Sequence, residues 1–347
     1  MRKLLLALII TIFTVSPVMA VELESPQAPS EVERYIPERS DSFVQDLLYI
    51  IKKALEEITP DFTDAMGLCA SVIAILLLIS AISGFSGIAK KTVDLAGVLA
   101  VSVLLLNPSR SLIAVGIDTI KSLCEYNKLL LPVLTTALAS QGGTATSAAL
   151  YGGTVVLNSV LTSLMTKVIT PLLYAYIVVG IVGASTGEKL LKQLLGFLKW
   201  SMTWLLKITA YVFTGYMGIT GVICGTVDAS TMKAAKLTIS GTVPVIGNII
   251  SDASEAVLVG MGVIKNSAGL YGALVILAIW ITPFLHVGLH YLLMKITSGI
   301  SSLIGDHKMV AVVAHFSSAM GFVLAMIGVA CILQLISIVC FLKGVHV

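Results

Sequence analysis

Polar side chains share one face of a short apolar stretch near residue 250. They recur three or four residues apart, the spacing that places side chains on the same side of a helix, and they are Asn248, Ser251, Asp252 and Glu255. The two carboxylates lie one helical turn apart, so they can take up protons, attract a cation or line a path for polar solutes. Lys236 and Lys265 are the nearest basic residues on either side.

Three environments remain open for Asp252 and Glu255. They can line a pore, pair with Lys236 or Lys265, or lie on an interfacial helix that faces water outside the membrane. Catalysis is the weakest interpretation, because neither a nucleophile nor a metal cluster accompanies the pair. The sequence contains no P-loop and no H-E-x-x-H pattern. We therefore predict that the protein is not an enzyme and has no cofactor and no catalytic residues.

His286 and His290 also lie one helical turn apart, a spacing that can hold a metal ion. No acid lies between them and no obvious third ligand accompanies them. We predict no metal site and interpret both as helix-packing or cavity-lining residues. The cysteines contain no C-x-x-C pair and are predicted to be small buried hydrophobes; they are Cys69, Cys124, Cys224, Cys331 and Cys340.

The segment that carries the acidic pair, residues 240–269, is too apolar for an ordinary loop and too interrupted for an ordinary span. Its interruptions are Gly241, Pro244, Gly247, Gly260, Gly262 and Gly269. A broken polar-striped segment at membrane depth is tolerated where it is buried in protein or lines a water-filled cavity. The sequence therefore predicts a re-entrant helical segment that lines a pore or contacts a partner, with Pro244 and Gly247 at its entry.

Composition places the whole chain in the membrane class. Of 347 residues, 57% are hydrophobic and only 12% are charged, about half the charged fraction of a soluble domain. The formal charge of +3 gives no electrostatic footprint for nucleic acid. We predict an all-α polytopic protein with five to seven spans of about 20 residues each.

The N-terminal region resembles a secretory leader. Residues 1–20 combine a basic start, an apolar core of about a dozen residues and a Val18-Met19-Ala20 cleavage pattern, and the alternative is an uncleaved first span. Cleavage would leave the mature N-terminus outside the cytoplasm. Residues 21–64 then form a short extracytoplasmic leader, in which residues 42–58 are an amphipathic helix that lies on the membrane or on a partner.

The N-terminal membrane helices are expected within residues 65–138. Spans are predicted at 67–83 and 93–106, and Asn107-Pro108-Ser109 is expected to end the second. Residues 111–131 carry charges on one side and are interpreted as interfacial or re-entrant. Residues 139–153 are rich in Gly, Ser and Thr and are predicted to be a linker.

The C-terminal membrane domain is expected to cover residues 154–347. Residues 155–165 contain Asn158 and other polar residues, which favours packing against protein instead of lipid. The predicted spans are 168–184, 204–225, 270–293, broken by Pro283, and 310–342. The last is either two segments hinged at Gly321 or one tilted helix with an interfacial part.

Two surface features of residues 187–225 point to contacts. Lysines interleave with leucines in a basic amphipathic helix at the cytoplasmic face, either an anchor or a docking site for a cytoplasmic partner; they are Lys189, Lys192, Lys199 and Lys207. Glycines three or four residues apart then form a smooth ridge suited to close helix packing; they are Gly215, Gly218, Gly221 and Gly225.

Ordered motifs between residues 196 and 272 resemble the stage III sporulation protein AE family of endospore-forming bacteria. They are Phe213-Thr214-Gly215-Tyr216, Met232-Lys233-Ala234-Ala235-Lys236, Val243-Pro244-Val245-Ile246-Gly247, Ser251-Asp252-Ala253 and Lys265-Asn266. The layout of signal peptide, short outside segment and multi-span body is also similar to that family. The first 140 residues match in character only.

The resemblance implies a permease-like membrane subunit of the transport channel that links mother cell and forespore during engulfment. Its implied partners are a cytoplasmic ATPase, other membrane proteins and ring-forming proteins of the same sporulation complex. The implied location is the mother-cell membrane around the forespore. Two other functions remain open: a self-sufficient secondary transporter that uses Asp252 and Glu255 for ion coupling, and a non-conducting membrane scaffold.

Overall fold

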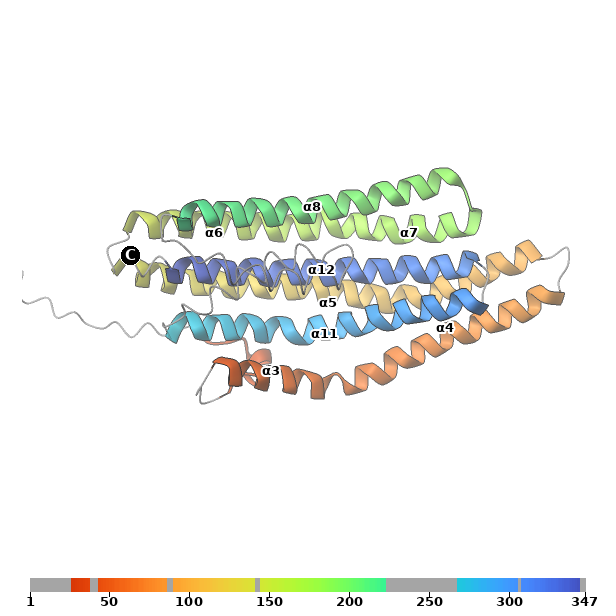
Figure 1. The fold of residues 1–347 in the computed structure, drawn as a ribbon, viewed down its shortest axis with the longest axis horizontal. Helices are drawn as coiled ribbons and strands as arrows, with labels where there is room; N and C mark the ends of the chain where they lie inside the picture. Colours follow the sequence, from red (N-terminus) through yellow and green to blue (C-terminus); the bar gives the residue numbers. More distant parts are fainter. Residues whose placement is uncertain are drawn as a thin grey trace, which may run out of the picture.

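The computed structural model describes residues 26–37, 43–85, 90–140, 144–222, 267–304 and 307–343. Within these ranges every regular element is helical, and the long helices run side by side as an elongated bundle (Figure 1). The helices are α2 (Ser30–Glu33), α3 (Phe43–Glu57), α4 (Thr59–Phe85), α5 (Lys90–Ser140), α6 (Thr144–Leu164), the π-helical turn η2 (Met165–Ile169), α7 (Thr170–Thr186), α8 (Lys189–Val222), α11 (Ser267–Ile304) and α12 (His307–Lys343).

Five stretches in the described residues are long and apolar enough to cross a membrane, which supports the predicted membrane class. They are Thr59–Ser83, Lys90–Ala139, Ser147–Thr186, Gly269–Leu303 and His307–Leu342. Helix α8 is not among them, although it packs beside α7 and α12. Residues 1–25 and 240–266 lie outside the described residues, so the predicted signal peptide and re-entrant segment stay predictions.

Helix α12 is the core of the bundle. In the most apolar part of α12, 89% of the residues are buried inside the protein, whereas in the most apolar part of α4 only 22% are buried. It packs on α5, α11, α7, α8 and α6. A helix that is apolar on all sides belongs in the centre of a large core, and here neighbouring helices, not lipid, cover most of it.

The predicted break after residue 106 is wrong. Helix α5 runs without interruption from Lys90 to Ser140, with Pro108 and Pro132 inside it. Each proline removes one backbone hydrogen bond, but packing of α12, α11 and α6 along α5 outweighs that cost, and prolines are tolerated in membrane helices. Residues 111–131 are therefore part of one rod of about 76 Å, far longer than the roughly 30 Å hydrocarbon core.

Three other predicted breaks are also absent. Residues 144–153, expected to belong to a linker, form the start of α6. Helix α11 continues through Pro283, and α12 continues through Gly321. A Cβ at Gly321 would lie 3.0 Å from the Tyr291 ring, so this glycine lets α12 approach α11 closely and does not act as a hinge.

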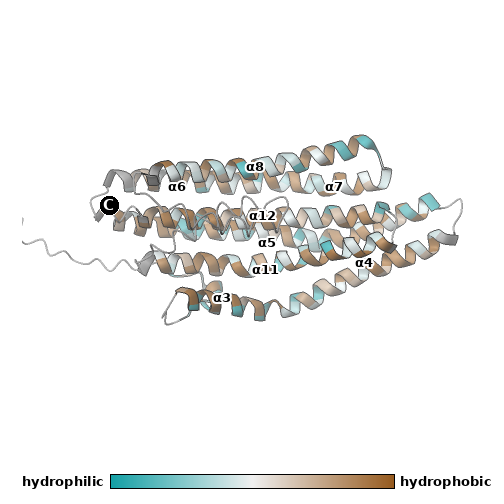
Figure 2. Cartoon of the chain, viewed as in Figure 1, coloured by the Kyte–Doolittle hydropathy of each residue, from teal (hydrophilic) through white to brown (hydrophobic). Residues whose placement is uncertain are grey.

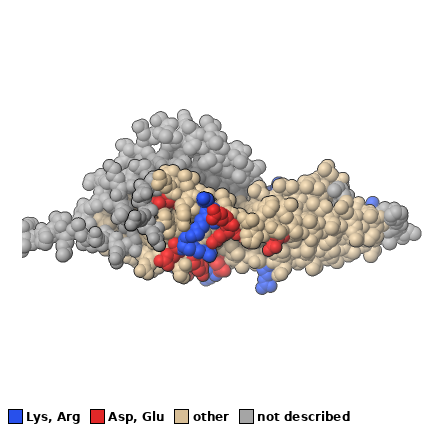
Figure 3. All heavy atoms as spheres, turned by 90° about the horizontal axis from the view of Figure 1, so that it is seen from below, with Lys and Arg blue, Asp and Glu red and all other residues tan. Residues whose placement is uncertain are grey.

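The amphipathic helix predicted at residues 42–58 is confirmed as α3. It packs against α11 of its own chain, with Ile50 and Ala54 fully buried. Seen from below, charged side chains gather over the middle of the molecule (Figure 3). The exposed charged residues of α2 and α3 are Glu31, Glu33, Lys52 and Glu56, and Arg34 directly after α2 is also exposed.

Helix α12 ends at one end of the bundle (Figure 1). At the other end α4 ends near the start of α5, α7 ends near the start of α8, and α11 ends near the start of α12. The lysines at this end are Lys90, Lys91, Lys189, Lys192 and Lys308. Lys308 Nζ donates to the Ser185 carbonyl at 3.3 Å, which ties the start of α12 to the end of α7.

Gly116 allows α5 and α12 to meet. A Cβ at this position would lie 2.5 Å from Val323 Cγ1. We expect Gly116→Ala to destabilise the bundle by about 1–3 kcal/mol, because an added methyl group overpacks the contact. Thermal unfolding of the protein in detergent measures the effect. Gly67→Ala is the matched control: it has nothing within 4 Å and should be neutral or stabilising by up to about 1 kcal/mol. Equal effects of the two changes would contradict this account.

Candidate functional site: polar clusters inside the bundle

Three amide side chains meet in the interior of the bundle. Asn127 on α5, Asn158 on α6 and Gln334 on α12 are all 0% exposed. Asn127 Nδ2 donates to Gln334 Oε1, and Gln334 Nε2 donates to Asn158 Oδ1 at 3.0 Å. Gln334 Nε2 also lies 3.3 Å from Cys124 Sγ. Gln334 therefore links three helices through one side chain.

One acceptor and one donor of the amide network have no hydrogen-bond partner among the described residues. They are Asn127 Oδ1 and Asn158 Nδ2, and both are buried. A buried polar atom without a partner costs about 1–3 kcal/mol, so such atoms usually serve packing specificity, bind water or mark a functional site. Ser337, one turn after Gln334, is also fully buried and its hydroxyl has no partner among the described residues.

We expect Gln334→Leu to destabilise the folded protein by about 1–3 kcal/mol, because the change leaves both asparagine amides unpaired. Thermal unfolding in detergent measures the loss. Gln193 on α8 is exposed, and Gln193→Leu should change stability by less than about 0.5 kcal/mol. If Gln334→Leu is as stable as the unaltered protein, the amide network does not constrain the bundle.

A second cluster joins α4 to α11. His286 Nδ1 lies 2.6 Å from Asp61 Oδ2, and the side chains are 27% and 36% exposed. The His290 ring lies one turn further on, with its centroid 5.1 Å from that of His286, and is 9% exposed. Among the described residues, no three His, Cys, Asp or Glu side chains converge to hold a metal ion.

His286, which contacts Asp61, lies three residues after Pro283 on α11. Proline removes the backbone hydrogen bond that would hold the preceding turn, so this side-chain contact fixes α11 to α4 next to a locally weakened part of the helix. We expect Asp61→Asn, His286→Gln and the double variant to destabilise by similar amounts, with a coupling free energy of about 0.5–3 kcal/mol.

Unfolding of the four proteins in a double-mutant cycle measures this coupling. The control cycle uses Asp118→Asn and Lys121→Gln, an exposed pair at 3.1 Å on α5 that should give at most about 0.5 kcal/mol. Additive effects at Asp61 and His286 would show that the two groups stabilise the fold independently.

A third pair lies between α7 and α12. The Tyr176 hydroxyl lies 3.2 Å from His315 Nδ1, and the rings pack edge to face at 5.7 Å. A Cβ at Gly180 would lie 3.1 Å from His315, so the missing side chain makes room for the imidazole. Ionisable side chains within membrane helices are costly and mark functional positions.

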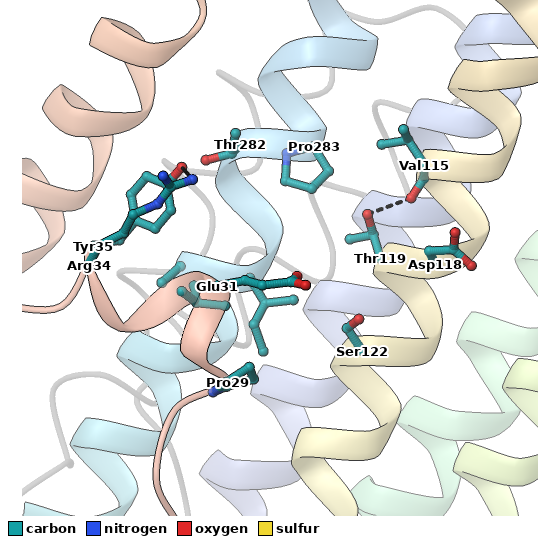
Figure 4. Close-up of a pocket in the computed structure, with 13 residues that line it drawn as sticks. Pro29, Glu31, Arg34, Tyr35, Val115, Asp118, Thr119, Ser122, Thr282 and Pro283 are labelled. Carbon is teal, nitrogen blue, oxygen red and sulfur yellow. Dashed lines mark hydrogen bonds between the residues drawn. The ribbon is translucent and has the colours of Figure 1, made fainter.

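A cleft of about 330 Å³ opens between the N-terminal segment, α5 and α11 (Figure 4). Glu31 from α2 and Asp118 from α5 lie on opposite walls, and Thr282 and Pro283 of α11 also line the cleft. Burial, and then a hydrogen bond to Glu57, raises the pKa of Tyr35 above its ordinary value of 10.0. The protonated Tyr35 hydroxyl therefore donates to Glu57 and anchors the N-terminal segment over the cleft.

The structure places only part of the sequence-predicted site. The pore or partner candidates lie outside the described residues, so their role stays a prediction; they are Lys236, Pro244, Gly247, Asn248, Ser251, Asp252, Glu255 and Lys265. Lys189, Lys192 and Lys199 are exposed on α8, and Lys207 is half-buried.

The two ridge glycines whose surroundings are described do not meet another helix. Gly215 and Gly218 are exposed, with nothing within 4 Å of a Cβ placed there. The surroundings of Gly221 and Gly225 lie outside the described part of the chain. The close helix contacts lie at other glycines, among them Gly97, Gly116 and Gly272. Close packing of another helix on the glycine ridge therefore stays a prediction.

Sequence reasoning missed Asn127, Gln334, Asp61 and His315. Gln334 and His315 each stand in a long apolar run, a signal that could have identified them as interior. Asn127 and Asp61 have charged residues nearby in the sequence and carry no such signal. It also missed a G-x-S-x-G match at residues 183–187. That match ends helix α7, and Ser185 Oγ donates to the Ile181 carbonyl at 2.9 Å, so it lacks the strand-to-helix turn that a hydrolase nucleophile needs.

Together these features define a polytopic helical membrane protein with hydrogen-bonded polar side chains in its interior. The model of one family, stage III sporulation protein AE, matches residues 32–344. The chain therefore belongs to the stage III sporulation protein AE family, and a role in sporulation follows from that membership.

One curated relative is the stage III sporulation protein AE of Bacillus subtilis (strain 168). It is 21% identical over 236 residues, which is 68% of this chain and 59% of the relative. The match thus spans about three fifths of the relative's length. No solved structure matches this chain.

Proposed function

We propose that this protein is a permease-like membrane subunit of the multiprotein transport channel between mother cell and forespore, and that sporulation requires it. Family membership over residues 32–344 is the observation that carries the proposal. The bundle supports it in two ways: five stretches can cross a membrane, and the interior contains buried amides and ionisable side chains. Such groups are common where a membrane bundle handles polar solutes.

The proposed location is the mother-cell membrane around the forespore. Lysines at the end where α4 meets α5, α7 meets α8 and α11 meets α12 (Figure 1) favour a cytoplasmic position for that end under the positive-inside rule. Helix α12 ends at the opposite end, and α4 begins partway along the bundle, beside α3 (Figure 1). The N-terminal leader and the end of α12 are then both extracytoplasmic.

The proposed partners are those that the family resemblance implies, and the orientation suggests which side each would contact. Other membrane proteins and ring-forming proteins of the sporulation complex would contact the spans and the extracytoplasmic end. The cytoplasmic ATPase of that complex would lie at the lysine-bearing end. Helix α8 ends and α11 begins at the end of the bundle opposite the lysines (Figure 1), and residues 240–266 lie between these two helices in the sequence. We propose that Asp252 and Glu255 act as pore-lining or partner-contact residues.

We expect Asp252→Leu together with Glu255→Leu to abolish the sporulation function while leaving the protein inserted, because the change removes the only carboxylates of the polar-striped segment. The test is complementation of an endospore former that lacks its own family member, scored by heat-resistant spores and by co-purification from sporulating cells. Glu33→Gln, an exposed acid on α2, is the control and should complement.

The outcomes separate the competing functions. Loss of spores together with loss of co-purifying membrane and ring-forming proteins supports the channel subunit. Solute movement down an ion gradient by the purified protein alone in vesicles would replace it with a secondary transporter. Full complementation by the double leucine variant would remove the acidic pair from the mechanism and favour a scaffold.

A further inference from the structure

An aromatic ladder lies on the outward face of α8. Phe197, Trp200 and Trp204 are 59%, 58% and 52% exposed. Their spacing of three and four residues places them on one side of the helix. The rings stack in sequence, with centroid separations of 6.1 Å and 5.9 Å. Exposed Trp in membrane proteins concentrates at the headgroup level, where an amphipathic ring suits the interface.

A row of lysines runs beside the ladder. Lys189, Lys192 and Lys199 are exposed, and Lys199 directly precedes Trp200. Gly196 lies between Lys192 and Lys199, and a Cβ there would have nothing within 4 Å. No side chain therefore covers the helix surface at this position. Glu188, directly before α8, is the only acid in residues 187–207, so the row keeps a positive charge.

The position of α8 favours lipid as the occupant. The helix lies at the edge of the bundle (Figure 1), and hydrophilic patches mark it near its junction with α7 (Figure 2). It packs through its buried side on α7 and α12, both of which contain candidate spans. Its lysines lie at the same end as Lys90, Lys91 and Lys308, where the bundle meets one membrane surface.

We propose that the ladder and the lysine row bind anionic phospholipid headgroups. The ammonium groups pair with lipid phosphate, and the aromatic rings lie against the upper acyl chains and glycerol. This surface would fix the depth of the bundle in an anionic leaflet. The inference does not depend on transport, and it can fail or succeed separately from the proposed channel role.

The tryptophans make the proposal directly measurable. The chain contains three, and the third, Trp280 on α11, has a buried indole nitrogen and packs on Phe284 at 4.2 Å. The full chain carrying Trp280→Phe reports only from the ladder. It is reconstituted in phosphatidylcholine vesicles containing phosphatidylglycerol, with brominated acyl chains on one lipid or the other, and quenching of tryptophan fluorescence is measured.

We expect the ladder to favour phosphatidylglycerol over phosphatidylcholine by at least about threefold in relative association constant at low salt. The preference should shrink as salt screens the charges. Trp280, isolated by Trp200→Phe and Trp204→Phe, should show no preference. Equal quenching of the ladder by both lipids would overturn the proposal.

Lysine variants test the charge contribution. Lys189→Gln, Lys192→Gln and Lys199→Gln together should bring the preference to about one, and Lys199→Gln alone should lower it measurably if the triple variant does not insert. The control is Lys121→Gln with Lys128→Gln, two exposed lysines of α5, which should keep the preference. The proposal is overturned if the preference for phosphatidylglycerol persists in the α8 lysine variants. It is also overturned if the preference is lost equally in the Lys121 and Lys128 control.

Discussion

The burial of α12 is the constraint on which the rest of the structure depends. Lipid tails are as apolar as the side chains of α12, so the hydrophobic effect does not drive this helix from lipid into the bundle. Close packing and hydrogen bonds between helices must hold it there instead. Gln334 provides such hydrogen bonds, because its side-chain amide is paired on both sides only when Asn127 and Asn158 lie within hydrogen-bonding distance. One side chain thus selects an arrangement in which α5 and α6 both flank α12.

The length of the helices has a functional consequence. A helix such as α5, at about 76 Å, cannot lie wholly within hydrocarbon of about 30 Å unless it is strongly tilted. The bundle therefore carries helical surface beyond the bilayer as a rigid continuation of its spans. The charged helices α2 and α3 pack onto α11 along this continuation, which offers partners a fixed surface instead of a mobile loop.

The polar groups are distributed among different helix contacts. Asp61 and His286 join α4 to α11, Tyr176 and His315 join α7 to α12, and the amide network joins α5, α6 and α12. Each contact fixes one helix pair, so the bundle can keep its shape without a continuous polar channel among the described residues. A passage for solute, as the proposed function requires, would then have to include the segment between α8 and α11 or a partner protein.

Local pattern alone determined the membrane class, the helix at residues 43–57 and the interior position of Asn158, because composition and periodicity depend only on neighbouring residues. It failed at Pro108, Pro283 and Gly321, where packing by distant helices outweighs the local tendency to break. Tertiary structure alone decided the polar contacts: Asn127 and Gln334 are 207 residues apart, and Asp61 and His286 are 225 apart. No local rule pairs residues at such separations, since the pairing follows from which helices pack together.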